Sequence, residues 1–358
     1  MSEDIIDRIR LARSPGIGPI TFRQLLQRFG SAGAALAALP DLARRGGGSA
    51  PRIARVEEAE HELAGVERLG ARYLVFGQGL YPWLLAEMED APPLLIVKGD
   101  HKLLDKPAVA MVGARNASAA ACRFARGLAH DLGREGLVVI SGLARGIDSA
   151  AHDGAMDSGT IGCAAGGIDI FYPPENEARQ RRMYEVGLVV SERPPGLEPR
   201  ARDFPRRNRI IAGMSAGTVV VEAAPRSGSL ITARLAGEAG REVMAIPGSP
   251  LDPRAQGCNQ LIRDGATLVQ NARDVLEALQ PSSAARVADP PKPFVPTSAE
   301  PSECERVSVI DLLGPVAVGV DELVRQSGAS PQDVQLVLLE LDLAGKLERR
   351  AGGRVSHV

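Results

Sequence analysis

Between about residues 80 and 280, short β-branched runs alternate with alanine-rich segments, and this alternation restricts the fold more than any other feature of the chain. Continuous apolar runs joined by helices are typical of a parallel sheet covered by helices on both faces. The sequence therefore predicts an α/β core, with helices such as 119–134 and 147–157. The expected strands are 108–112, 137–140, 160–164, 188–190, 218–221, 242–246 and 267–269.

A second domain is expected before this core, because 358 residues suffice for two or three domains. Residues 1–75 have the pattern of small helices, and the turn Pro15–Pro19 separates two of them as in a helix-hairpin-helix element. The backbone N–H groups of that turn can meet a DNA phosphate, or its glycines can simply make a packing hairpin. Arg44 to Pro51 is predicted to be a flexible loop.

The predicted core spans residues 76–280. The chain that follows it divides into a linker and a last domain. Residues 281–305 are rich in Pro, Ser and Ala and predict a disordered linker. Residues 306–358 predict three helices and a β-hairpin, the layout of a winged helix. The third helix, 331–345, has no Lys or Arg and would repel DNA, which favours protein contact or self-association. Removing 306–358 is therefore expected to leave single-strand affinity nearly intact.

Composition narrows the class of protein. The first ten residues are not typical of a signal peptide, and no run of about 18 apolar residues predicts a membrane span, so we expect a cytoplasmic protein. The four cysteines are scattered, which favours reduced thiols and no metal site. Aromatic residues make up 3%, so nucleic acid, if bound, would be held mainly through its phosphates and not by base stacking.

The segment from Phe204 to Ala233 is the strongest indication of a polyanion site. A cluster of arginines begins just before this segment and continues into it. The net charge of the whole chain is only -2, so the cluster is a local feature and not the result of a basic composition. An apolar strand comes next, and then the hydroxyl-rich turn Arg226–Ser229. A positive cluster beside a strand-to-helix turn suits an anion at the edge of an α/β sheet. The arginines are Arg200, Arg202, Arg206, Arg207 and Arg209.

Two further loops point to the same edge. Arg115 stands two residues after Gly113, where a dinucleotide enzyme would carry G-x-G-x-x-G, and its guanidinium can hold a phosphate bidentately. The loop Ser141–Gly146 precedes a helix whose N-terminus can meet an anion, and it is not a Walker A loop. Each feature alone could be a surface arginine or a structural turn. Together they predict a ligand longer than a mononucleotide and no cofactor.

Acidic residues and a histidine give little indication of catalysis. Asp148 and His152 lie four residues apart and could pair on one helix face. Asp148 is better placed to support the glycine loop, and His152 to be a structural histidine. Asp153, Glu192 and Glu222 are the other candidates, but no nucleophile with an adjacent base is evident. We expect a binding protein and not an enzyme.

Successive motifs between about 105 and 270 resemble the DNA-processing protein A (DprA/Smf) family, with Leu80–Pro82 and Pro92–Leu95 similar to its lead-in. The motifs are GARNAS, SGLARGIDSAAHDGA, TIGCAAGGIDIFYPPEN, SERPPG, the segment from Phe204 to Gly248, and GCNQLIRDGATLV. The resemblance implies a bacterial single-stranded DNA-binding protein that loads RecA recombinase in natural transformation. It also implies an extended Rossmann-like, mostly parallel core that dimerises, an N-terminal SAM or helix-hairpin-helix domain and a C-terminal winged helix.

The resemblance and the charge pattern together give the candidate DNA-binding residues. Two departures are visible: Ala114 stands where the family commonly has serine, and Ala119-Ala120 replaces a frequent Tyr-Gly pair. The candidates are Arg115, Ser118, Ser141, Gly142, Arg145, Gly146, Arg206, Arg207, Asn208, Arg209, Ser227, Gly228 and Ser229.

The alternative hypothesis is a Rossmann-like hydrolase acting on nucleoside monophosphates. Such enzymes pair a P-G-G-x-G-T motif with a glutamate. Here Pro247-Gly248-Ser249-Pro250 breaks that motif and no Thr-x-x-Glu follows, which favours the DNA-binding protein. Loss of base release in Glu222→Gln would favour the hydrolase.

Overall fold

The computed structural model describes residues 2–49, 51–280, 301–350 and 352–358. The chain forms two compact units, one made of Met1–Leu63 with Val287–Val358 and the other of Ala64–Arg286. Most of the predicted linker 281–305 lies outside the described residues. Its end is not a linker, because Ser302 and Glu305 form a capping box that starts helix α13 (Glu303–Asp311).

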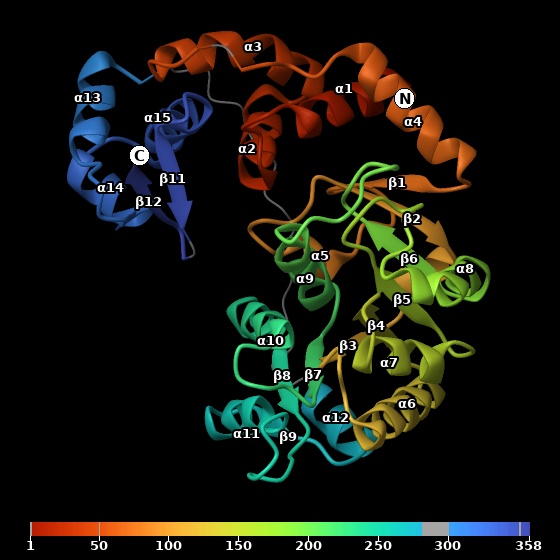
Figure 1. Cartoon of the computed structure of the whole chain (residues 1–358). Coiled ribbons are helices and arrows are strands. Elements are labelled where there is room, and N and C mark those ends of the chain that lie inside the picture. Colours follow the sequence, from red (N-terminus) through yellow and green to blue (C-terminus); the bar gives the residue numbers. More distant parts are fainter. Residues whose placement is uncertain (1, 50, 281–300, 351) are drawn as a thin grey trace. The chain divides into compact units, whose positions relative to one another are not determined.

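The second unit contains a nine-stranded sheet of order β1-β2-β6-β5-β4-β3-β7-β8-β9 (Figure 1). The seven strands from β6 to β9 in that order are parallel, which confirms the predicted α/β class. Their bounds are β3 (Ala108–Gly113), β4 (Val138–Gly142), β5 (Thr160–Cys163), β6 (Leu188–Ser191), β7 (Gly217–Val221), β8 (Glu242–Ala245) and β9 (Thr267–Leu268).

The sequence did not predict the two strands at the other edge of the sheet. β1 (Arg72–Val75) pairs antiparallel with β2 (Leu94–Gly99), and β2 pairs antiparallel with β6. The sheet therefore begins at Arg72, inside the range assigned to the helical domain. β1 is four residues long, and a run this short is hard to recognise before its partner strand is known.

Helices cover both faces of this sheet because alternate residues of the strands point to opposite sides. In β3, Val109 and Met111 pack with α6 (Ala119–Arg134), α7 (Ile147–Ala155) and α12 (Ala272–Leu279). Ala110 and Val112 belong to the opposite cluster, with helices α5 (Trp83–Ala86), α9 (Asp203–Gly213), α10 (Gly228–Glu238) and α11 (Gln256–Arg263). Helix α8 (Glu177–Val186) packs near the antiparallel edge.

The first unit has two parts. Four helices open the chain, namely α1 (Ser2–Arg13), α2 (Pro19–Phe29), α3 (Ala32–Arg45) and α4 (Val56–Arg68), the last of which extends past Leu63 into the second unit. The tight turn between α1 and α2 is the predicted hairpin. After α13 come β10 (Val318–Gly319), α14 (Val320–Ser327), α15 (Pro331–Leu343), β11 (Leu347–Arg350) and β12 (Arg354–His357). Three helices and a three-stranded sheet of order β10-β12-β11 form the predicted winged helix.

None of the helices within the described ranges combines the length and the apolar character that crossing a bilayer requires.

Candidate nucleic-acid interface

The loops after β3, β4 and β7 meet at one rim of the sheet, because these strands are neighbours in the order β4-β3-β7. Two adjoining hollows lie there and share Arg115 and Arg207. Of the other predicted residues, Arg145 lines the first hollow. Asn208, Ser227, Gly228 and Ser229 line the second.

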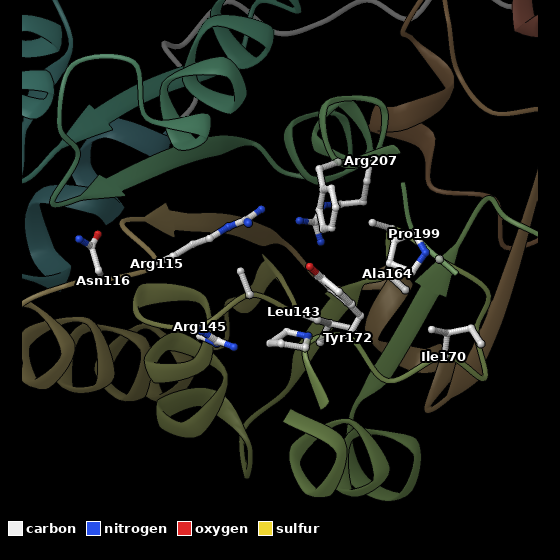
Figure 2. A pocket seen from close by; sticks show the side chains of 14 residues that line it. Arg115, Asn116, Leu143, Arg145, Ala164, Ile170, Tyr172, Pro199 and Arg207 are labelled. Atoms are coloured by element: carbon white, nitrogen blue, oxygen red, sulfur yellow. The ribbon is translucent and has the colours of Figure 1, made fainter. Parts of the chain in front are cut away.

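The first hollow combines cations with aromatic rings. It has a volume of about 250 Å³, below the range of sites for drug-sized ligands. Figure 2 shows Arg115, Arg207 and Tyr172 converging on it from different elements. The rings of Tyr172 and Phe204 lie 5.5 Å apart, and the Arg115 guanidinium lies 5.1 Å from the centre of the Phe204 ring. This cavity suits one planar ring beside a phosphate.

Sequence reasoning missed Tyr172 and Phe204 as site residues. Counting aromatics gave a low total and a groove without stacking surfaces, whereas the fold gathers two of the few rings at one place. Tyr172 is 45% exposed, so a face of its ring is open to a base. Their positions were the available signal, since Phe204 opens the arginine segment and Tyr172 lies in the loop that follows β5.

Arg207 lies inside helix α9 and is only 7% exposed. Its guanidinium donates to the Cys163 carbonyl, and it faces Asp148 across Gly142. Burial raises the pKa of Asp148 and lowers the pKa of Arg207, while the charge of each residue opposes the shift of the other. Arg207 therefore packs against Gly142 at the start of the glycine loop, and one edge of its guanidinium lines the hollows.

His152 is a structural histidine, as predicted. Its ring nitrogens lie 2.7 Å from the Thr160 hydroxyl and 2.6 Å from the Gly142 carbonyl oxygen. Burial lowers the pKa of His152 to about 4, so the ring is neutral at pH 7. Asp148 accepts from the backbone N–H of Ala144 at 3.3 Å, the predicted support of the loop.

Gly146 joins two of the loops. Its φ is +73°, and a Cβ there would overlap the carbonyl oxygen of Ala114. The β4–α7 loop can therefore approach the β3–α6 loop closely enough to place Arg145 and Arg115 on one hollow. Arg145 is largely exposed and pairs with Glu175.

The turn after β7 supplies hydroxyls and two strained residues. Glu222 and Arg226 have φ values of +56° and +74° although neither is glycine, and such outliers cluster at functional sites. The hydroxyls of Ser227 and Ser229 lie 2.7 Å apart at the start of α10. Asn208 donates to the Gly228 carbonyl at 3.3 Å, which ties α9 to this turn. Arg226, the first residue of the predicted turn, and Arg254, which the sequence did not indicate, also line the second hollow and add positive charge.

The N-terminus of α6 is already occupied by an acid of this chain. The Glu222 carboxylate accepts from the backbone N–H of Ser118 at 2.6 Å and lies 3.8 Å from Arg254. Ser118 itself caps α6 by accepting from Ala121. In nucleotide-binding folds a phosphate takes this place. Ser118 is thus engaged internally, and Glu222 has a structural partner.

The remaining predicted residues do not line the two hollows. Arg209 is buried and pairs with Glu192 at 2.6 Å, with Asp90 nearby. The Ser141 hydroxyl donates to the Met111 carbonyl at 2.5 Å. Arg206 is exposed on α9 and Gly142 ends β4, and neither lines a hollow. In the described part of the chain, no group of three or more His, Cys, Asp or Glu is placed to hold a metal ion.

The chain thus combines three domains: a helix-hairpin-helix domain, an extended Rossmann-like core and a winged helix. This combination defines a class of three-domain proteins. Residues 72–280 match the DNA recombination-mediator protein A family, and the chain belongs to that family. Residues 2–65 match the DprA-like N-terminal HHH domain and residues 291–353 the DprA winged helix domain.

Curated relatives carry the DprA and Smf names. The chain is 48% identical to the DNA processing protein DprA of Streptococcus pneumoniae over 198 residues, 55% of this chain and 70% of that protein. It is 35% identical to Protein Smf of Escherichia coli over 299 residues, 83% of this chain and 80% of the relative.

Two solved structures are similar. The S. pneumoniae DNA processing protein A structure superposes with a TM-score of 0.63 and 38% identity, covering 75% of this chain and 95% of that one. The Helicobacter pylori protein gives a TM-score of 0.53 and 29% identity over 58% of this chain and 95% of that one. That structure is described as revealing a unique single-stranded DNA binding mode.

Proposed function

We propose that the two hollows form one groove that binds single-stranded DNA and that the bound protein loads a RecA recombinase during natural transformation. The observation that carries the proposal is the convergence of Arg115, Arg145 and Arg207 on the Tyr172–Phe204 pair. The description of the H. pylori relative supports the choice of ligand. The recombinase step and dimerisation through the core rest on the family resemblance.

Each part of the groove has a role in this proposal. Arg115 and Arg145 are exposed and hold phosphates, and Arg226 continues the positive track along the second hollow. The ring pair takes one base by stacking. Arg207 orients the loop and contributes an N–H edge. No step needs a nucleophile or a cofactor, so the protein acts by binding.

A salt titration of single-strand binding tests the phosphate contacts. Arg115→Ala should weaken binding of a short oligothymidylate and flatten the slope of log K against log salt by about 0.7, because one phosphate contact is lost. Arg134→Ala is the matched control, since this exposed arginine ends α6 away from both hollows. Equal effects of the two variants would refute the assignment of the groove.

RecA loading needs a separate measurement. Purified protein should speed assembly of RecA filaments on single strands coated by a single-strand binding protein, and Arg115→Ala should reduce that rate in proportion to its affinity loss. Normal DNA binding without any acceleration would remove the loading role and leave the binding role intact.

A further inference from the structure

We propose that α15 is a docking helix for the chain's own N-terminal helical domain and not a DNA-reading helix. In winged-helix and related DNA-binding domains, the helix at this position presents side chains to base edges in the major groove. In this chain, the side of α15 that does not face the winged-helix core packs against α2 and α3. The inference concerns the first unit alone and is independent of the groove in the core.

Two apolar stripes run along α15. Val334, Val337, Leu338 and Leu341 follow the spacing of one helix face and pack in the winged-helix core. Leu336, Leu339 and Leu343 follow the spacing of another face and are buried in the same cluster as Leu36 and Leu39 of α3. A helix that reads DNA needs one face free to contact the bases. On α15, apolar residues cover both of these faces and are buried there.

Polar contacts fix the position of this second face. The Thr21 hydroxyl donates to Asp342 at 2.8 Å, and the amides of Gln24 and Gln335 meet at 2.7 Å. Arg349 bridges Asp342 at 3.1 Å and Gln24 at 3.1 Å. Specific hydrogen bonds of this kind distinguish a built interface from a loose apolar contact.

The glycine loop after α3 is shaped to this helix. A Cβ on Gly46 would overlap the Glu340 carbonyl oxygen, and one on Gly48 would lie 2.7 Å from the Ala344 Cα. Gly46 has an ordinary helical φ of -69°, so its own backbone does not require glycine. The requirement comes from the approach of α15. Within the segment predicted as a flexible loop, residues 46–48 therefore lie against the C-terminal end of α15.

The acids of α15 also have internal partners. Glu340 is buried and pairs with Arg306 of α13, and Asp342 contacts α2 and β11. Asp333 accepts from the hydroxyl of the N-cap residue Ser330 at 2.6 Å. These side chains stabilise the winged helix and its docked state, which explains why a helix free of Lys and Arg is retained there.

A cross-linking experiment on the full chain tests the docked state. Gln24→Cys and Gln335→Cys are introduced together with Cys304→Ser, because Cys304 is exposed. Mild oxidation should give a link within one chain, seen as a monomer with joined peptides by mass spectrometry. Adding Gly46→Val should lower the yield at least fivefold. Adding Gly314→Val should not, since a Cβ at Gly314 meets nothing within 4 Å.

A link only between two chains, or a yield that Gly46→Val leaves unchanged, would overturn the proposal. Duplex affinity gives a second readout that does not depend on cysteine geometry. Gly46→Val should keep duplex DNA affinity within twofold of the parent, because the uncovered helix brings no positive charge. A larger rise would make α15 a masked DNA-reading helix and would also overturn the proposal. Single-strand affinity should stay constant and reports that the core is folded.

Discussion

The rim of the core sheet and helix α15 both belong to folds that often bind nucleic acid, but they carry opposite side chains. At the rim, arginines on separate loops converge beside two aromatic rings. On α15, leucines and acids face the chain's own helices. The difference shows that the fold only determines where a binding surface can form. The charge and burial of the side chains there determine whether that surface binds nucleic acid or protein.

The largest expected effect concerns the arginine beneath the rim. Arg207→Ala should lower the free energy of unfolding by about 3–5 kcal/mol, because it leaves Asp148 buried without its cation. Urea unfolding measures this loss, with Arg206→Ala as the control on the same helix. The exposed Arg206 should change stability by less than about 0.5 kcal/mol. Similar losses in both variants would contradict the buried role of Arg207.

The buried histidine predicts a pH dependence of stability. Because the pKa of His152 falls to about 4 in the folded core, the unfolded chain binds more protons between about pH 4 and 6.5. Its contribution therefore destabilises the fold as the pH falls through that window, by roughly 3 kcal/mol in total. The raised pKa of Asp148 acts in the opposite direction.

Comparing variants isolates the histidine. His152→Gln should flatten the fall in stability between pH 6.5 and 4 relative to the parent. His61→Gln, which removes an exposed histidine, is the matched control. Urea unfolding at a series of pH values makes the comparison. An unchanged slope in His152→Gln would mean that other groups set the acid sensitivity.

The aromatic pair should contribute to binding through bases and not through phosphates. Tyr172→Ala should weaken single-strand binding by about 1–3 kcal/mol, the usual value of one stacked base. Its salt slope should remain that of the parent. With an oligonucleotide whose sugars carry no bases, the parent and the variant should bind alike. A loss that persists without bases would assign Tyr172 to phosphate contact or to folding.

Adding the same charge to both regions gives the smallest and most direct comparison. Asn116→Lys should tighten single-strand binding and steepen the salt slope by about 0.7, since Asn116 is exposed and lines both hollows. Gln332→Lys makes the same neutral-to-positive change at an exposed position of α15 and should change the affinity by less than twofold. Equal gains would place DNA on both regions. Substitution is cleaner than the truncation of 306–358, which would uncover Leu36 and Leu39.

The sequence predicted the parallel strands because β-branched runs leave a period that needs no tertiary information. It treated Arg206, Arg207 and Arg209 as one patch because adjacency along the chain hides direction. In helix α9 successive residues rotate, so Arg206 faces solvent, Arg207 faces Asp148 and Arg209 faces Glu192. The ring pair and the contacts of Gly46 join distant segments, and no local pattern contains them.

The carboxylate of Glu222 on the backbone N–H of Ser118 has a consequence for selectivity among small molecules. It acts as a built-in substitute for the phosphate that a free nucleotide would place at this helix start. A single nucleotide then gains too few contacts to stay, while a strand that spans both hollows is anchored at several points. We expect the groove to bind single-stranded DNA and not the free nucleotides of the cell.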